Sequence, residues 1–151
     1  KAGDGLDGDG WYTTGDIGSY SAASGIQIMG RADEMIISGG ENIQPQQVER
    51  LLHDCPGINE ICVLGVDDPE WGERVCAVYS GDSSGQLVEQ WCRKNIDGPL
   101  RPRLFVRLAQ LPRLSNGKID RKQLLSRVIL SRGRSQIGWV CLFTYGTVNP
   151  I

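Results

Sequence analysis

Short runs of apolar residues, each bounded by turn-forming residues, predict the strands of a sheet. Residues 61–66 and 75–79 are rich in β-branched side chains, and the turn-forming stretch 67–72 between them favours their pairing. A further strand is expected at 104–108. Shorter strands are predicted among the glycine-rich turns nearer the start of the chain, at 11–13, 26–29 and 35–37.

Apolar residues three or four positions apart predict two helices in the middle of the chain. The first begins at Pro45, which suits the first turn of a helix, and ends before Pro56 and Gly57. The second covers residues 86–94. The residues expected on the inner faces are Val48, Leu51 and Leu52 in the first helix and Leu87, Val88, Trp91 and Cys92 in the second.

A third helix is predicted after the tight turn at Asn116 and Gly117, with Asp120 as its N-cap and an end near Val128. This order of elements predicts an α+β fold, a small β-sheet with about three helices packed on it. The uncharged residues 135–151 leave three interpretations open, namely an extra strand, a disordered end or an oligomer contact.

The composition is that of one ordinary soluble domain. The chain has 151 residues, of which 40% are apolar and 23% are charged. Its mean hydropathy is −0.25, and no apolar run approaches the roughly 20 residues that span a bilayer, so no membrane span is expected. The chain opens on Lys1 and a stretch rich in glycine and aspartate, without a signal-peptide pattern, which indicates a piece of a longer protein.

Five cysteines lie in apolar surroundings along the chain, at Cys55, Cys62, Cys76, Cys92 and Cys141. Their number is odd and none belongs to a C-x-x-C pair, which argues against a disulfide framework or a zinc site. We expect them to be small, reduced core residues of a cytoplasmic protein, and we predict no metal site.

The formal net charge of −2 hides a strong division along the chain. Residues 1–92 hold 4 of the 16 basic and 16 of the 18 acidic side chains, whereas residues 93–134 hold the other 12 basic side chains and only two acidic ones. A basic segment in an acidic protein suggests a polyanion partner, and nucleic acid, nucleotide and coenzyme phosphates all qualify. The alternative is a solvated surface that pairs with the acidic half after folding.

Two segments near the start of the chain contain residues suited to binding a nucleotide. In Gly10–Asp16, the carboxylate of Asp16 follows a glycine turn, where it can accept hydrogen bonds from a ribose diol or simply cap the turn. In Gly30–Ile43, the order of an arginine, a strand and a diglycine suits a phosphate contact, a hinge and a narrow channel wall. The alternative for this second segment is a strand bracketed by turns.

A third segment, Leu111–Arg121, presents Lys118 on a tight turn. A lysine in this position can reach into the cleft of another domain and neutralise charge that develops on a phosphate or a carboxylate. The alternative is an ordinary exposed lysine on a turn.

Together the three segments resemble the acyl-adenylate-forming enzymes, which include acyl- and aryl-CoA synthetases, amino-acid adenylation domains and luciferases. The resemblance runs from about Gly10 to about Leu125 and includes the strings W-Y-x-T-G-D, G-R-x-D-x-x-I-I-S-G-G-E-N-I and L-P-x-x-x-x-G-K-I-D-R. It implies that residues 1–31 are the hairpin-rich end of a larger N-terminal adenylation domain, that residues 32–128 are a mobile C-terminal lid, and that residues 129–151 are a tail of unknown role.

The resemblance also implies roles for individual residues. Asp16 is similar to the aspartate that binds ribose, Arg31 to the arginine at the nucleotide, and Asp33 to the hinge residue. Lys118 is similar to the lysine of the adenylation step. The expected coenzyme A contacts are Gly39 and Gly40, which match glycines that line the pantetheine tunnel, and Trp71, Arg101 and Arg103, which fall where coenzyme A synthetases contact the coenzyme nucleotide.

The substrates implied by this resemblance are a carboxylic acid, ATP with Mg²⁺ bound mainly by the large domain, and coenzyme A. Within the family, residues 43–50, with Gln44 before the helix-opening Pro45, are similar to the 2-succinylbenzoate–CoA ligases of menaquinone and phylloquinone biosynthesis. Another acyl- or aryl-CoA synthetase, an adenylation domain that loads a carrier protein, and a non-catalytic basic module are the alternatives. On the main interpretation nucleic acid is not a partner, and a homo-oligomer stays open.

Overall fold

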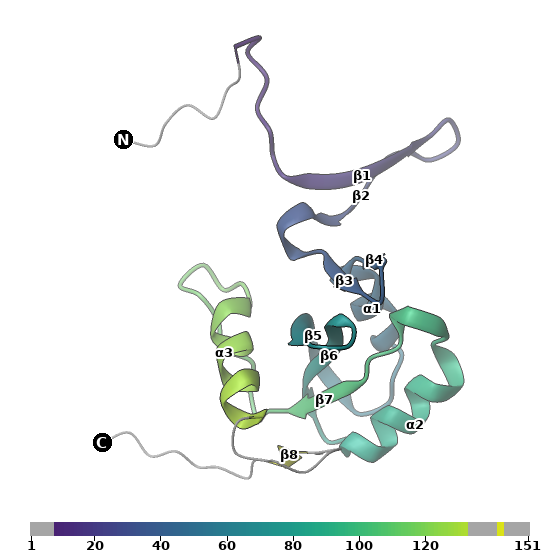
Figure 1. The fold of residues 1–151 in the computed structure, drawn as a ribbon, viewed down its shortest axis with the longest axis vertical. Coiled ribbons are helices and arrows are strands. Elements are labelled where there is room, and N and C mark those ends of the chain that lie inside the picture. Colours follow the sequence, from purple (N-terminus) through teal and green to yellow (C-terminus); the bar gives the residue numbers. More distant parts are fainter. Residues whose placement is uncertain (1–7, 133–141, 144–151) are drawn as a thin grey trace.

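The structure is a computed structural model that describes residues 8–132 and 142–143. Its elements, shown in Figure 1, are strands β1 (Asp16–Ser21), β2 (Gly25–Arg31), β3 (Ile36–Ser38), β4 (Glu41–Ile43), β5 (Ile58–Asp68), β6 (Gly72–Gly81), β7 (Leu104–Arg107) and β8 (Leu142–Phe143), helices α1 (Pro45–Leu52), α2 (Gly85–Asn95) and α3 (Arg121–Arg132), and the 3₁₀ turns η1 (Ala32–Glu34) and η2 (Gly98–Leu100).

The long hairpin β5–β6 is the centre of a mixed sheet. Its strands are antiparallel, with Val63 opposite Ala77, which confirms the predicted pairing of 61–66 with 75–79. The other edge of β6 pairs with two strands. Ser38 of β3 pairs with Gly72 at the start of β6, and β7 runs parallel to the later part of β6. The two-residue strand β8 pairs with β7, which supports the extra-strand interpretation for that part of the tail.

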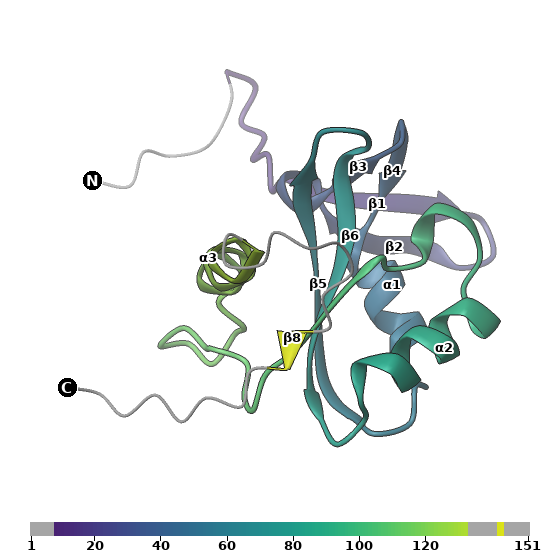
Figure 2. The same ribbon diagram turned by 60° about the horizontal axis from the view of Figure 1, so that its bottom comes forward.

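Helices cover both faces of this sheet, with α1 and α2 on one side and α3 on the other (Figure 2). Alternate residues of β5 enter different cores: Val63 packs with α1 and α2, whereas Cys62 and Leu64 pack with α3. Because both faces are buried, β5 and β6 are continuous apolar runs rather than alternating ones. The predicted α+β fold with about three helices is confirmed.

Local capping explains where the helices begin. Pro45 occupies the first turn of α1, the Ser84 hydroxyl accepts a hydrogen bond from Leu87 N at the start of α2, and Asp120 Oδ1 accepts one from Gln123 N at 2.9 Å. The predicted cap at Asp120 is therefore confirmed, although α3 continues to Arg132 rather than ending near Val128.

Three local predictions were wrong. Residues 11–13 do not form a strand, since only Tyr12 takes part in an isolated bridge, and the first strand begins at Asp16. Gly10 and Gly15, on either side, both have positive φ, which does not fit an extended strand. Leu51 and Leu87, expected on inner faces, are 38% and 58% exposed. In helices this short, the apolar face that meets the sheet is only one or two residues wide, and Val48, Leu52, Val88 and Cys92 fill it.

The cysteines behave as core residues. Cys55, Cys62, Cys76 and Cys92 are buried, as predicted, and Cys141 lies outside the described residues. Burial raises the pKa of Cys62 and of Cys92 to about 12, so both are protonated thiols near neutral pH.

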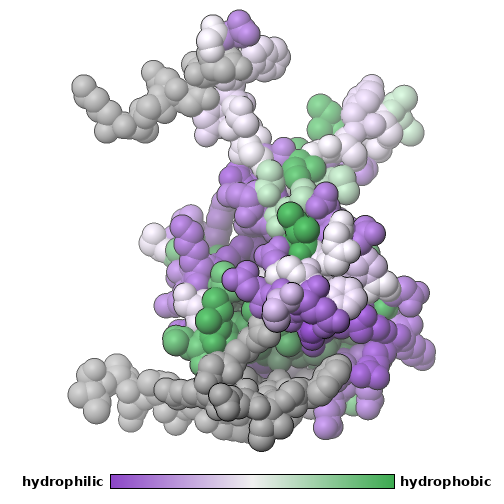
Figure 3. Space-filling view, in the orientation of Figure 1, coloured by the Kyte–Doolittle hydropathy of each residue, from purple (hydrophilic) through white to green (hydrophobic). Residues whose placement is uncertain are grey.

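The hairpin β1–β2 lies apart from the sheet and its two cores (Figure 1). Gly30 is its one buried residue, whereas Tyr20, Ile26 and Ile28 are 76%, 76% and 64% exposed. Apolar side chains accordingly appear on the surface of this hairpin in the space-filling view (Figure 3). The hairpin thus contributes nothing to the two cores, and it is joined to the sheet through η1.

Candidate functional site

Three of the predicted site residues meet where the hairpin joins the sheet. Arg31, the last residue of β2, donates hydrogen bonds from Nε and Nη2 to the two carboxylate oxygens of Asp33 at 3.0 and 3.2 Å. Its Nη1 donates to Thr14 O at 2.7 Å and lies 3.7 Å from Asp16 Oδ1. The structure therefore brings the expected ribose, nucleotide and hinge residues, Asp16, Arg31 and Asp33, into one exposed cluster.

The charges in this cluster stabilise one another. The hydrogen bond and the negative charge of Asp33 raise the pKa of Arg31, and the hydrogen bond from Arg31 lowers the pKa of Asp33. Asp33 belongs to η1, a single 3₁₀ turn that is the only regular element between β2 and β3. In the same turn, Ala32 N donates a hydrogen bond to Gly15 O at 2.8 Å. One short turn thus carries the connection between the hairpin and the sheet.

A second group of predicted residues meets at the turn between β5 and β6. Gly39 and Gly40 form the β3–β4 turn with φ of 59° and 85°, a conformation that favours glycine. Gly39 N donates to Trp71 O at 2.9 Å, and a Cβ on Gly39 would lie 2.8 Å from the indole ring. Trp71 is 48% exposed. We call Gly39, Gly40 and Trp71 the glycine end of the molecule.

Arginines gather beside the glycine end. Arg103 N donates to Val75 O at 2.9 Å, which places Arg103 next to the start of β6. Burial lowers the pKa of Arg103, and the positive charges of Arg101, Arg74 and Arg93 lower it further. Arg74 is paired with Asp68 and Glu70, and Arg93 is paired with Glu89. Of the predicted coenzyme residues, Arg103 thus lies beside β6, the strand that follows Trp71 in the chain, and Arg101 lies two positions before it. Guanidinium groups of this kind are suited to binding phosphate groups.

Lys118 lies on a separate, exposed turn before α3. A hydrogen bond from Leu114 N to Lys118 O at 2.8 Å closes the turn. Within the turn, Gly117 adopts a φ of 83°. Arg113 stabilises the turn by donating to Gly117 O at 2.7 Å and by an ion pair with Glu60 of β5. We call residues 114–118 the lysine end. In residues 8–132 and 142–143, Lys118 has no ion-pair partner within 4.0 Å.

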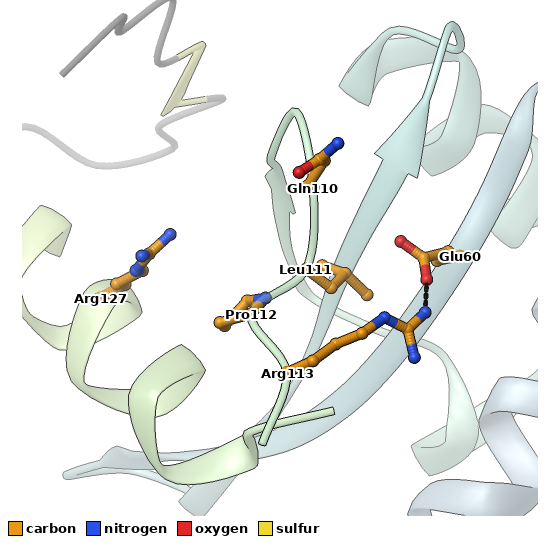
Figure 4. Close-up of a pocket in the computed structure, with 6 residues that line it drawn as sticks. All are labelled: Glu60, Gln110, Leu111, Pro112, Arg113 and Arg127. Atoms are coloured by element: carbon orange, nitrogen blue, oxygen red, sulfur yellow. Dashed lines mark hydrogen bonds and ion pairs between the residues drawn. The ribbon is translucent and has the colours of Figure 1, made fainter. Parts of the chain in front are cut away.

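The two ends lie at opposite ends of β5. The lysine end is attached to Glu60, near the start of the strand, and the Asp68 carboxylate at its finish accepts hydrogen bonds from Glu70 N and Trp71 N. Figure 4 shows the Arg113–Glu60 pair beside a surface hollow lined also by Leu111, Pro112 and Arg127. Lys118 is therefore not brought together with the glycine end. Among the described residues, no hydrogen bond or ion pair joins Lys118 to Asp16 or Arg31.

The comparison with protein families identifies the central part of the chain. Residues 47–118 match the family model of the AMP-binding enzyme C-terminal domain. This part of the chain belongs to that family. The surrounding superfamily is that of the acyl- and aryl-CoA ligases, which agrees with the expected resemblance.

Individual relatives of the AMP-binding C-terminal domain differ in the acid that they are named for. A 4-chlorobenzoate–CoA ligase of Pseudomonas sp. (strain CBS-3) is 42% identical over 108 residues, which are 68% of this chain and 20% of that protein. A 2-succinylbenzoate–CoA ligase of Listeria monocytogenes serotype 4b (strain F2365) is 33% identical over 121 residues, 79% of this chain and 26% of that protein. The chain thus spans about a fifth to a quarter of the length of these curated relatives.

The fold is also that of solved ligases. The o-succinylbenzoate–CoA synthetase of Bacillus subtilis, in complex with its acyl-adenylate intermediate, superposes with a TM-score of 0.70 and 33% identity, covering 77% of this chain and 24% of that one. The predicted closeness to 2-succinylbenzoate ligases is thus one similarity among several, because the chlorobenzoate ligase is more similar in sequence.

The residues described in the domain contain no group of three or more histidine, cysteine, aspartate or glutamate side chains arranged to hold a metal ion. Binding of Mg²⁺ mainly by another domain stays a prediction. None of the helices in these residues combines the length and the apolar character that a membrane-spanning helix requires.

The sequence analysis did not predict the ion pairs of Arg121. Arg121, the first residue of α3, forms ion pairs with Glu34 at 3.3 Å and with Glu49 at 2.7 Å. Glu34 directly follows Asp33, so this network connects the start of α3 to η1. The partners of Arg121 are far from it in sequence, and no local pattern signals their meeting.

Proposed function

We propose that this chain is the C-terminal part of an AMP-forming acid–CoA ligase, with residues 32–128 as a lid that rotates about Asp33. The reaction joins a carboxylic acid to coenzyme A and converts ATP to AMP and pyrophosphate. The observation that carries the proposal is the placement of Lys118 and of the glycine end at opposite ends of β5. A rigid lid built in this way presents one end at a time to a neighbouring cleft.

In the first step, a carboxylate oxygen attacks the α-phosphorus of ATP, the bond to pyrophosphate breaks, and acyl-AMP forms. Lys118 stabilises the negative charge shared between the carboxylate and the phosphate, and it transfers no proton. Asp16 accepts hydrogen bonds from the ribose diol, and Arg31 contacts the nucleotide. The position of Lys118 on an exposed turn supports this role, since its ammonium group is available to a ligand from outside the domain.

In the second step, the thiol of coenzyme A attacks the acyl carbonyl carbon and AMP leaves. Rotation about Asp33 withdraws Lys118 and brings the glycine end over the adenylate. Gly39 and Gly40 leave room for the pantetheine chain, while Trp71 offers a flat ring to the coenzyme nucleotide and Arg101 and Arg103 bind its phosphates. The thiol is supplied by the coenzyme, so the buried cysteines take no part.

The narrower proposal for the acid is 2-succinylbenzoate, with cytoplasmic menaquinone or phylloquinone biosynthesis as its context. The ligases named for this acid in Listeria monocytogenes and Bacillus subtilis support it, together with Gln44 before Pro45. Gln44 is buried at the N-cap of α1 beside Gly30. Its similarity therefore concerns how the lid packs on β2 and not a contact with the acid.

The decisive test is Lys118→Ala in the full-length enzyme, with the two half-reactions measured separately. We expect acyl-AMP formation to fall by about 10²- to 10³-fold, because a charge-stabilising group is lost from the transition state, while thioester formation from supplied acyl-AMP is spared. Lys122→Ala, an exposed lysine of α3, is the matched control. Equal loss of both steps in Lys118→Ala would contradict the division of roles between the two ends.

A direct titration separates a ligase from a non-catalytic basic module. Coenzyme A added to the chain should shift the NMR signals of Gly39, Gly40 and Arg101. A preference for duplex DNA that falls steeply with salt would instead indicate a nucleic-acid module.

A further inference from the structure

Arg121 connects three separate elements through one side chain. Its guanidinium group donates to Val63 O of β5 at 2.7 Å and to Glu49 Oε1 of α1 at 2.7 Å, and its Nε lies 3.3 Å from Glu34 Oε1 of η1. Its side chain is 25% exposed. A planar fork with five N–H donors can serve three acceptors at once, which a lysine ammonium on a flexible chain does poorly.

The partners of Arg121 are themselves held in place. Glu34 Oε2 accepts a hydrogen bond from Gln46 Nε2 of α1 at 2.7 Å, and Glu49 Oε1 accepts a second one from Val63 N at 2.9 Å. Burial alone would lower the pKa of Arg121, but Cys62, Glu49 and Glu34 raise it, and the net direction is upward. Each charged group of this network is therefore bound to at least two partners, and the network connects α1, β5, η1 and α3.

This network lies between the hinge and the lysine end. Glu34 is the residue after Asp33, and Arg121 comes three positions after Lys118 in the chain. On its N-terminal side, Arg113 stabilises the Lys118 turn through a hydrogen bond to Gly117 O. The C-terminal side continues through Asp120 into Arg121, and Asp120 N donates a hydrogen bond to Pro112 O at 2.8 Å. Removing the Arg121 side chain would take away the ion pairs that join this side of the turn to η1 and α1. Only its main-chain bonds to residues 112–114 and its packing beside α3 would remain.

We propose that Arg121 is a positioning residue for the adenylation step: by binding Glu34 and Glu49, it fixes the turn that carries Lys118 relative to the hinge at Asp33. The proposal rests on the function proposed above. Arg121 touches no substrate, and it acts by keeping the lysine end and the hinge in one rigid body, so that rotation about Asp33 delivers Lys118 to a defined place. A small displacement of such a group is enough to impair a reaction that depends on orientation.

The test uses Arg121→Met, Arg121→Lys and Glu34→Gln in the full-length enzyme, with Arg127→Met as the matched control on the exposed side of α3. We expect Arg121→Met to lower kcat for acyl-AMP formation by about 10- to 100-fold with KM for ATP unchanged. Thioester formation from supplied acyl-AMP should be unaffected. Arg121→Lys and Glu34→Gln should lose less, since each keeps part of the network, and Arg127→Met should match the parent enzyme.

The possible outcomes are distinct. Equal loss of both half-reactions in Arg121→Met, in proportion to a lower Tm, would show a merely structural residue and overturn the proposal. If Arg121→Met does not fold, Glu34→Gln decides: an adenylation rate equal to that of the parent would overturn it. If Lys118→Ala leaves acyl-AMP formation intact, the proposed function itself fails, whatever Arg121 does. Loss confined to adenylation in both network variants supports the proposal.

Discussion

The lysine end and the glycine end differ in the chemical groups that they expose. At the lysine end a charged group stands on a tight turn, and side chains attach that turn to the rest of the domain through Arg113 and Arg121. At the glycine end the surface is bare backbone and one indole ring, joined by a main-chain bond from Gly39 to Trp71. One end therefore offers charge to a ligand, and the other offers space and a flat apolar face.

The sheet between the two ends keeps them apart. From Glu60 to Asp68, β5 extends roughly 25 Å at the usual rise of a strand. Both of its faces are packed, with Val63 in one core and Cys62 and Leu64 in the other. A close-packed strand does not bend to bring its ends together. Only movement of the whole unit can present the two ends to one cleft in turn, and η1 is the short connection available for it.

The largest difference between the two half-reactions is expected when the backbone of the hinge is made rigid. In full-length enzyme, Asp33→Pro should lower thioester formation by at least about 10²-fold, because proline fixes φ near −65° in the 3₁₀ turn and the glycine end no longer reaches the adenylate. Acyl-AMP formation should be spared, which single-turnover measurement of each step will show. Asp33→Ala removes the carboxylate without fixing φ and is the control. An unimpaired thioester step in Asp33→Pro would mean that the two ends do not alternate about this residue.

A smaller effect is expected at the glycine end itself. Gly39→Ala should lower thioester formation by about tenfold, since its new methyl group would lie 2.8 Å from Trp71 Cε3 and displace the ring. Gly40→Ala has the same left-handed strain, but its methyl group meets nothing within 4 Å. The ratio of the two variants in a coenzyme A-dependent assay isolates the ring contact. Equal rates for both would mean that the position of Trp71 is unimportant.

The smallest effect concerns the exposed pair at the hinge. Arg31 lowers the pKa of Asp33 from its ordinary value of 3.8, so the stabilisation from this pair is present above about pH 4 and is lost as the pH falls through the lowered value. In an NMR titration of the chain, Arg31→Ala should raise the midpoint of the Asp33 carboxyl group. Arg50→Ala, an exposed arginine of α1, should leave it unchanged. The same midpoint in both variants would show that Arg31 does not hold the hinge.

Local signals were enough for much of the fold and of the candidate site. Pro45 and Asp120 begin helices because their backbone and side-chain preferences act within one turn, and Gly117 shapes the Lys118 turn for the same reason. The approach of Gly39 to Trp71 has no such signal, since it depends on β3 pairing with the start of β6.

By itself, the sequence determined the central pair of strands, the three helices, the starts of α1 and α3, the Lys118 turn and the residue types that the proposed chemistry needs, because these depend on neighbours a few positions away. Only the tertiary structure decided that helices cover both faces of the sheet, that Leu51 and Leu87 face solvent, that Lys118 and the glycine end lie far apart, and that Arg121 meets Glu34 and Glu49. The physical reason is that burial and ion pairing act between groups that are close in space, and the packing of the sheet brings together residues that the chain itself keeps dozens of positions apart.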